Sequence, residues 1–563
     1  MRSSVVAGMT LAVLALAGPV QAQRPYVQAP FAVAGDTILA VAVRTPLDTA
    51  WLGASLLTPI PDVQEPIIQA QDATRPEAFR GDTTLPCLEF ECAEPGTRNK
   101  RFLRALGEVV IVNIIPNAFS RLQDKEWSKW TLQSWADNIK YPWQWDNNAF
   151  LNNQFSHPYH GSLYFNAGRS NGYNFWQSVP WAFGGSLMWE LFFEVWAPAP
   201  NDLLNTSLGG IALGEMLYRV SSLTLDNEAT GTERVFREIG ATLINPVRGF
   251  NRAVDGTMFK HSRTPDEWRP STIFANVELG YRRFSTNEDI TDPNALETGY
   301  VGASLVYGAA ISDVTKAPFS HFRLNSLISF QPGEGARRLS ELTVRGSLGG
   351  MVLGDPAALS RLAAFMTYEY ISNPIMEFGA QGFQGGWLHS TQPTSGPRLY
   401  FDAAAVFNPI AAVKSDYFLS EEGRDYDYGI GLGGRGEMRA IWTGRAFIGA
   451  VANYRFVPVI SGFPAQHQLL NLGVDGRYYF RGRWGVGAAY NQLWRWSAYT
   501  DRADFNKKSS ELRVFVATAI PRWEDIKSTF VACGSRSRSR APSASWRART
   551  RSSGPSGRRI TRS

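Results

Sequence analysis

The second half of the chain, from about Ser271, alternates apolar residues with small or polar residues in segments of about ten to fifteen residues. Stretches such as TGYVGASLVYGAAI and RWGVGAAYNQLWRW place glycine and alanine on one side and aromatic residues on the other. This period-2 pattern is typical of a transmembrane β-barrel. Twelve segments show it: 271–284, 298–311, 318–331, 338–352, 362–372, 375–388, 397–411, 426–440, 442–457, 466–480, 482–496 and 509–520.

An even number of antiparallel strands can close on itself, and closure is required because open strand edges are not tolerated in lipid. Residues 265–523 are therefore predicted to form an outer-membrane β-barrel of about 12 strands. The alternative is a soluble β-sandwich, in which strands this long, this rich in glycine and flanked by Tyr and Trp are less usual.

The N-terminus predicts how the barrel reaches that membrane. Residues 1–22 have the features of a secretory signal peptide: Arg2, the apolar run VVAGMTLAVLALAG, and a cleavage site at Val20-Gln21-Ala22. Cleavage would leave Gln23 as the first residue. The alternative is an uncleaved membrane anchor.

Residues 23–100 are rich in proline and lack periodicity, so we predict an extended periplasmic lead. Cys87 and Cys92 lie within it, in PCLEFECAEP. An oxidising periplasm permits a disulfide across this small loop, with two free thiols as the alternative.

Between the lead and the barrel, residues 101–260 predict a helical domain. Its most unusual part threads polar and ionisable residues through an aromatic background between Asn152 and Gly214. Tyr173–Trp196 is predicted as one buried helix, which carries Glu190 and Glu194 four residues apart on an apolar face. Two carboxylates placed there need a partner, such as a base, a metal or a shared proton.

The next helix is predicted to start after Pro198 and Pro200, with Asn201 or Asp202 as its N-cap. Three residues of this helix share a face at i, i+3 and i+7, and three glycines would let a second backbone approach closely. The shared face consists of Asp202, Asn205 and Gly209, and the glycines are Gly209, Gly210 and Gly214.

Further along, Asn245 and Pro246 predict an N-cap followed by proline at the first helical position. Arg248 follows on that helix. With Arg169, it is a candidate structural partner for the buried carboxylates.

Two classes of function are open for the helical domain. In the first, His157 and His160 would meet Glu190, Glu194 or Asp202 and form a catalytic His/carboxylate site, or a metal site, acting on an envelope lipid. In the second, the domain is a plug or cap for a structural or transport-like barrel, and its ionisable residues are satisfied buried pairs. The second class is favoured because buried His and Glu are more often structural, and the zinc motif H-E-x-x-H is absent from the sequence.

The C-terminal residues 524–563 do not fit the barrel pattern. Within them, residues 534–563 hold nine Arg, no Lys and no acidic residue, although the formal net charge of the whole chain is only +6. The rest of the chain is therefore net acidic. We interpret 524–563 as a disordered or out-of-frame extension rather than a nucleic-acid-binding arm, since an exported barrel does not meet nucleic acid.

Three stretches resemble a known family: YHGSLYFNAGRSNGYNFWQSVPWAFGGSLMWE, PNDLLNTSLGGIALGE and INPVRGFNRAVDG. They are similar to the bacterial domain-of-unknown-function family 3943, over about residues 100–260. The resemblance implies an envelope protein with a helical core domain attached to a barrel. It implies no activity and assigns no catalytic residue.

The sequence thus predicts an α+β protein, in which a helical domain precedes an antiparallel transmembrane barrel. Expected partners are outer-membrane lipid and the export and barrel-assembly machinery, with no nucleic acid. Cofactor, metal and substrate are left open.

Overall fold

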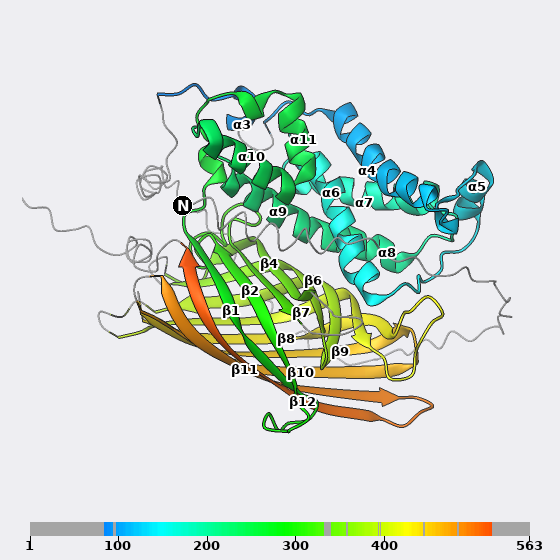
Figure 1. The fold of residues 1–563 in the computed structure, drawn as a ribbon, viewed down its shortest axis with the longest axis vertical. Coiled ribbons are helices and arrows are strands. Elements are labelled where there is room, and N and C mark those ends of the chain that lie inside the picture. Colours follow the sequence, from blue (N-terminus) through cyan, green and yellow to red (C-terminus); the bar gives the residue numbers. More distant parts are fainter. Residues whose placement is uncertain are drawn as a thin grey trace, which may run out of the picture.

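The computed structural model describes residues 84–93, 97–330, 339–355, 359–391, 393, 396–442, 445–480 and 483–520. It has two parts, a closed β-barrel and a layer of helices on one side of it (Figure 1). The predicted signal peptide, most of the lead and the predicted extension lie outside the described residues.

The barrel consists of twelve antiparallel strands, each paired with its neighbour in sequence, and β1 closes onto β12 from Ala275↔Ile520 to Ser285↔Ser510. The predicted α+β class and barrel are confirmed. The strands are β1 (Ile273–Ser285), β2 (Leu296–Tyr307), β3 (Phe322–Phe330), β4 (Leu339–Val352), β5 (Ser360–Asn373), β6 (Met376–Ser390), β7 (Arg398–Lys414), β8 (Tyr426–Trp442), β9 (Ala446–Ser461), β10 (Ala465–Tyr479), β11 (Trp484–Tyr499) and β12 (Phe505–Ile520).

The helical part consists of α-helices of four to 21 residues joined by turns and loops. It comprises α3 (Glu89–Cys92), α4 (Phe102–Leu122), α5 (Leu132–Lys140), α6 (His157–Ser170), α7 (Phe175–Phe192), α8 (Pro200–Leu204), α9 (Gly210–Thr224), α10 (Gly231–Ile244) and α11 (Pro246–Val254). Two π-helical segments, η4 (Asn152–Ser156) and η5 (Asn205–Gly209), precede α6 and α9.

Ion pairs identify the inner side of the barrel. Arg323 on β3 binds Glu437 on β8, with Nη1 2.7 Å from Oε2, and four strands separate β3 from β8 in the sheet. The bond therefore crosses the lumen. Side chains alternate along each strand, so Arg345 on β4 also faces the lumen, where it binds Asp402 at 2.6 Å, and its neighbour Val344 faces outward.

The outer side of the barrel is apolar. On β9 to β12 and β1, the outward side chains are exposed aliphatic and aromatic residues. These include Leu279, Ile448, Leu472, Val474, Trp484, Val486, Val514 and Val516. Charged inside and apolar outside is the arrangement of a barrel that sits in lipid, so the predicted transmembrane barrel is confirmed against the soluble sandwich.

The helices cover another part of the outer wall, at one end of β2 to β8. There outward-facing side chains are buried in one apolar core together with side chains of α6, η5 and α9, whereas Phe407, Leu432 and Met438, farther along their strands, are exposed. The barrel contributes Leu305, Tyr307, Phe322, Leu324, Leu342, Val344, Met366, Tyr368, Tyr370, Ile410, Ala412, Tyr426 and Tyr428 to this core. The predicted helical region is thus present, and it lies against the side wall of the barrel rather than in the lumen or over one of its ends.

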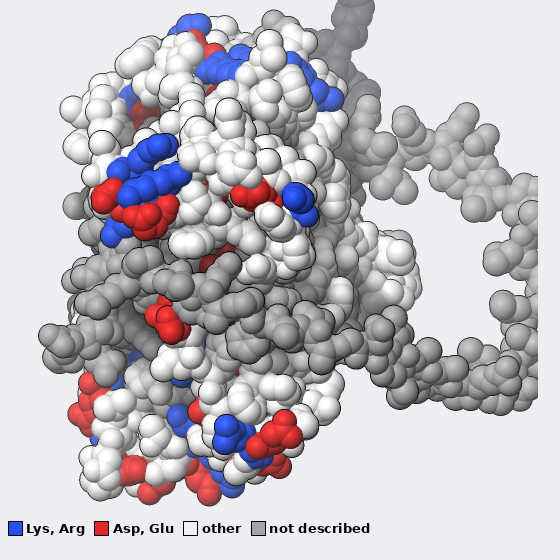
Figure 2. All heavy atoms as spheres, turned by 90° about the vertical axis from the view of Figure 1, so that its right-hand side faces the viewer, with Lys and Arg blue, Asp and Glu red and all other residues white. Residues whose placement is uncertain are grey.

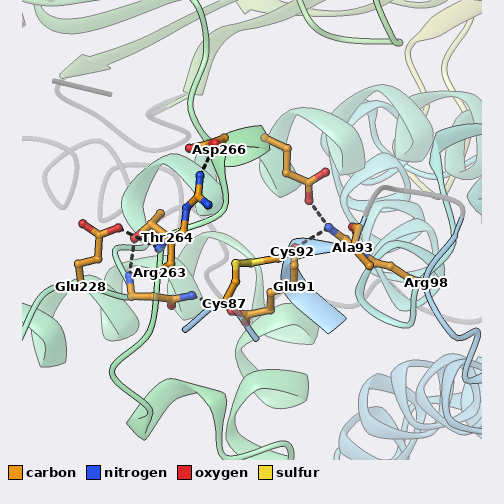
Figure 3. The surroundings of a disulfide bond; sticks show 11 residues. Cys87, Glu91, Cys92, Ala93, Arg98, Glu228, Arg263, Thr264 and Asp266 are labelled. Atoms are coloured by element: carbon orange, nitrogen blue, oxygen red, sulfur yellow. Dashed lines mark hydrogen bonds and ion pairs between the residues drawn. A yellow bond between two sulfur atoms is a disulfide. The ribbon is translucent and has the colours of Figure 1, made fainter. Parts of the chain in front are cut away.

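The predicted lead is only partly as expected. Residues 86–92 are not extended, because α3 and a Cys87–Cys92 disulfide, with Cα atoms 6.0 Å apart, fold this segment onto the helical domain (Figure 3). Glu91 contributes to the attachment by binding Arg252 of α11 and Asn227. The helical domain therefore begins before residue 101.

Candidate functional site

The candidate residues meet where helix α6 lies against the π-helical segment η5. A Cβ added to Gly161 of α6 would stand 1.7 Å from the carbonyl oxygen of Thr206 in η5, so only glycine permits this approach. A Cβ on Gly210 would similarly meet the backbone of Gly161, and one on Gly209 would meet Pro158. The predicted close approach at these glycines is therefore present. π-helical segments are rare and occur frequently at functional sites.

Four carboxyl groups gather beside this contact. Glu190 lies in the last turn of α7, Glu194 just beyond its end and Asp202 in α8, while Asp146 precedes η4. Glu190 Oε2 accepts a hydrogen bond from the Ala199 backbone N–H at 2.8 Å. The other Glu190 oxygen, Oε1, has no hydrogen-bond partner among the described residues.

Hydrogen bonds hold the other acids in place. Glu194 Oε1 accepts from Trp189 Nε1 at 2.7 Å, and Asp202 Oδ1 accepts from Asn201 Nδ2 at 2.8 Å. Asp146 Oδ2 accepts from the Asn153 side chain at 2.8 Å and from the Asn148 backbone at 2.9 Å. Amides and an indole, rather than arginines, are thus the donors to this cluster.

Burial controls the protonation of the cluster. It raises the pKa of Glu190 well above its usual range, with repulsion from Glu194 as the second cause. It raises the pKa of Glu194 to about 8 and that of Asp202 well above its usual range, and Asp146 adds repulsion to both. These acids therefore tend to hold protons at neutral pH, which removes the need for a cationic partner.

The two candidate histidines differ. His157 Nε2 lies 3.8 Å from Asp202 Oδ2, and its Nδ1 lies 3.2 Å from Thr206 Oγ1. His160 instead contacts the Val112 carbonyl oxygen and the Tyr164 hydroxyl, both at 3.2 Å. Burial lowers the pKa of His157, and it lowers that of His160 to about 4, so both rings are neutral at pH 7. Of the predicted pair, His157 thus lies next to an acid, Asp202, but their separation is longer than a hydrogen bond.

A set of hydrogen bonds joins the acid cluster to the barrel, and we call it the helix–barrel interface. Tyr428 Oη on β8 accepts from the side-chain amides of Gln154 and Asn205, both at 3.1 Å, and more distantly from Asn201. Tyr426 accepts from Asn153 at 2.9 Å. Tyr368 on β5 donates to the Gln154 carbonyl oxygen at 2.7 Å.

Arginines predicted to neutralise the carboxylates do so elsewhere. Arg169 binds Glu215 of α9, with Nε 2.7 Å from Oε2. Arg248 donates to the Tyr218 carbonyl oxygen at 3.0 Å and stacks over the Tyr218 ring. Asn245 caps α11 by accepting from the Arg248 backbone N–H at 3.1 Å, as predicted.

Two local predictions were wrong. α7 ends at Phe192 rather than Trp196, because the Val195 backbone N–H bonds the Trp127 carbonyl oxygen instead of continuing the helix. The N-cap of α8 is Ala199, not Asn201 or Asp202, because Pro200 occupies the first helical position, where its missing N–H costs nothing.

Sequence reasoning also missed Asp146 and the interface tyrosines. Asp146 stands in QWDNNAF, outside any helical pattern. Tyr426 and Tyr428 stand in an alternating strand, where tyrosine looks like an ordinary lipid-interface residue. The run of amide side chains at Asn152, Asn153 and Gln154 was the one signal that a polar partner lay nearby.

Among the described residues, no group of three or more His, Cys, Asp or Glu side chains is arranged to hold a metal ion. The family model for Domain of unknown function (DUF3943) matches residues 142–247, which include every candidate catalytic residue. The chain contains a DUF3943 domain. The resemblance predicted from the sequence is confirmed over this range, which lies within the predicted 100–260.

No curated protein matches the chain. Solved structures similar to it include the porin NanC, at 11% identity and a TM-score of 0.24, covering 43% of this chain and 98% of NanC. The outer membrane channel DcaP of Acinetobacter baumannii follows, at 8% identity and a TM-score of 0.20, covering 44% and 96%. The CymD monoaromatic hydrocarbon channel is 9% identical with a TM-score of 0.19, and the match covers 45% of this chain and 88% of CymD. Similarity at this level indicates no solute for this chain, which is an outer-membrane β-barrel with a helical region.

Proposed function

We propose that this DUF3943 protein is a narrow outer-membrane channel for small polar or charged solutes, with the barrel lumen as its path. The observation that carries the proposal is the set of ion pairs that crosses the lumen. Besides Arg323–Glu437, Arg455 on β9 binds Glu369 on β5 at 3.0 Å, and three strands separate β5 from β9. Charges of both signs on the wall favour water and ions over apolar solutes.

The crossing pairs also set the width of the path. Glu437 is bound by Arg323, Arg435 and Arg439 together, and Arg435 and Arg345 share Asp402. These side chains lie in the lumen between β3 and β8, and the two acids are nearly fully buried. We infer that the pairs form its constriction and that breaking the crossing pair widens it.

The acid cluster of the helical domain has a structural role in this proposal. Its neighbours Asn153, Asn201 and Asn205 all bond tyrosines of β8, so the cluster lies next to the contact that attaches the helices to the barrel. His157, His160, Glu190, Glu194 and Asp202 then position that contact, and the lumen performs the function.

The proposal includes the route to the membrane. Export with cleavage after Ala22, followed by insertion by the barrel-assembly machinery, would give a mature chain that begins at Gln23. N-terminal sequencing of the outer-membrane fraction tests this, and the same fraction should show heat-modifiable migration on gels.

Single-channel conductance in planar lipid bilayers tests the channel. The double variant Arg323→Ala/Glu437→Gln removes the crossing pair, so its conductance should exceed that of the native protein severalfold. Arg283→Ala/Glu297→Gln is a matched control, because this pair bridges β1 and β2 near their connecting loop and does not cross the lumen. Equal conductance of the two double variants would contradict the constriction. If neither the native protein nor either variant conducts, the channel proposal is wrong and the barrel is a scaffold.

A further inference from the structure

Helix α4 has its polar and apolar faces exchanged relative to a helix of a water-soluble domain. Its buried residues include Glu108, Asn113 and Asn117. Apart from Arg121 in the last turn, its exposed large residues are apolar: Phe102, Leu103, Ile111, Ile114, Ile115, Phe119 and Leu122, with Leu103 80% and Ile115 63% exposed. A soluble amphipathic helix does the opposite.

The same exchange occurs in α10. Arg234 and Glu238 point into the domain, where they bind each other at 2.9 Å, whereas Phe236 is 67% exposed and Ile239 51%. Glu233 and Arg237 form a second ion pair in the first half of this helix, where the Glu233 side chain is 54% exposed and that of Arg237 17%.

In α11, Arg248 and Arg252 are buried while Phe250 and Val254 are exposed. Three helices from different parts of the domain thus share one pattern.

The charged residues of the helical domain form ion pairs in its interior. Arg252 binds Glu91 and Glu238, and Glu215 binds Arg169 and Arg219. Paired charges inside and aliphatic residues outside is the pattern of the barrel itself, built here from helices.

The position of the domain beside the lipid-facing wall indicates what its exposed apolar faces contact. The helices lie on the outer wall of the barrel at β2 to β8, and the rest of that wall carries the lipid-facing residues of β9 to β12 and β1. In Figure 1 the helical layer lies alongside the barrel, and α4, α10 and α11 lie farther from the strands than α9. A domain that covers this part of the wall displaces lipid from it. The face of the domain that points away from the barrel would then meet the lipid instead.

We propose that the exposed faces of α4, α10 and α11 contact the acyl chains of the outer membrane, so that the helical domain lies in the bilayer beside the barrel. α4 has 21 residues and is long and apolar enough to cross a membrane. At about 1.5 Å per residue it spans about 30 Å, the thickness of a hydrocarbon core. Its charged residues lie toward its ends, at Arg104 and Arg121, apart from the buried Glu108.

Figure 2 shows the Lys, Arg, Asp and Glu side chains of one face in small groups of mixed sign, separated by uncharged surface. A second copy of the chain is the other occupant that an apolar face would accept, and the experiment distinguishes it from lipid.

Nitroxide labels on single cysteines test the proposal in the full chain, with Cys533→Ser to remove the third cysteine of the sequence. Labels at Ile115 on α4 and Ile239 on α10 are placed in vesicles of phosphatidylethanolamine and phosphatidylglycerol. Collision with oxygen, which concentrates in lipid, is compared with collision with a water-soluble nickel chelate. A label at Val516 on the outer barrel wall is the lipid control, and one at Asp289 in the exposed β1–β2 loop is the water control.

Ile115 and Ile239 labels should match Val516, with an oxygen-to-nickel collision ratio several times that at Asp289. A ratio equal to that at Asp289 would overturn the proposal. So would low collision with both reagents together with spin–spin broadening, which would assign the face to a second copy. Each variant is first checked for heat-modifiable migration. Because two helices are probed, a position that does not fold leaves the other decisive, and the outcome does not depend on whether the barrel conducts.

Discussion

The barrel and the helical domain reach the same arrangement of polar and apolar residues by different routes. In the barrel, period-2 alternation sends Arg323 and Glu437 inward and residues such as Val516 outward. In the helical domain, whole helix faces do so, with Glu108 inward and Ile115 outward on α4. The difference lies in where the charged residues pair. Those of the barrel pair with one another in the lumen, whereas those of the helical domain pair between neighbouring helices.

Removal of one partner from a packed ion pair should have the largest effect. Glu215 is fully buried between Arg169 and Arg219, at 2.7 and 2.9 Å. Glu215→Met leaves two buried cations unpaired, and the expected loss of stability is about 3–5 kcal/mol. Urea unfolding in detergent micelles, followed by the helical circular dichroism signal, measures it.

The counterpart in the barrel is Glu369→Met, which leaves Arg455 in the lumen. Glu369 is 18% exposed, so water can reach this pair and the loss should be smaller. Equal losses for the two variants would mean that the lumen is as dry as the helical core, which would also argue against a channel.

The acid cluster should make the helical domain depend on pH, and the barrel provides the reference. Burial raises the pKa of Glu194 to about 8, from an ordinary value near 4.5. A raised carboxyl pKa contributes stability that is fully present below about pH 4.5 and is lost as pH rises through about 8, at about 1.4 kcal/mol per pKa unit. Hydrogen exchange in α7 and α8 should therefore speed up between pH 6 and pH 9, beyond the intrinsic chemical dependence.

Glu194→Gln tests the assignment, because glutamine resembles the protonated acid and still accepts from Trp189. This variant should flatten the pH dependence. An unchanged profile would assign the dependence to Glu190 or Asp202 instead.

Glycine packing should give the next effect. A Cβ on Gly161 would stand 1.7 Å from the Thr206 carbonyl oxygen, so Gly161→Ala must separate α6 from η5, at a cost of about 1–3 kcal/mol. Gly184 on α7 has no heavy atom within 4 Å of its added Cβ, so Gly184→Ala should stabilise by about 0.5–1 kcal/mol, the helix preference for alanine. Thermal unfolding of the two variants should move in opposite directions. A shift of the same sign in both would show that the close approach is not required.

The two regions were not equally predictable from sequence. All twelve strands were placed, within a few residues at their ends, because one period decides both their existence and their inward face. Helix ends were less well placed, since a tertiary bond from Val195 to Trp127 ends α7, and no local pattern reports it. The carboxylates and His157 were found as candidates because ionisable residues are conspicuous in an apolar stretch.

Two features of the helical domain could not be found in this way. The hydrogen-bond partners of the acid cluster, such as Asn201 and Trp189, come from the folded arrangement of the loops. The lateral position of the domain depends on which strand residues are covered, and outward tyrosines have the same sequence pattern whether lipid or a helix covers them.

The smallest loss of stability should come from the helix–barrel interface, where the two regions meet. Tyr428→Phe removes the oxygen that accepts from Gln154 and Asn205, and it leaves the ring against Trp145 at a centroid distance of 5.3 Å. A neutral hydrogen bond contributes about 1 kcal/mol net, and the stranded amides add a desolvation cost, so the loss should be about 1–2 kcal/mol. It should appear as faster hydrogen exchange in η4 and η5 with unchanged exchange in β9 to β12. Tyr454→Phe is the matched control, because Tyr454 also uses its hydroxyl, toward Gln468 at 2.9 Å, but does so on the exposed barrel wall away from the helices. If Tyr428→Phe leaves η4 and η5 protected, then the apolar core alone attaches the domain, and the acid cluster has no part in holding helices and barrel together.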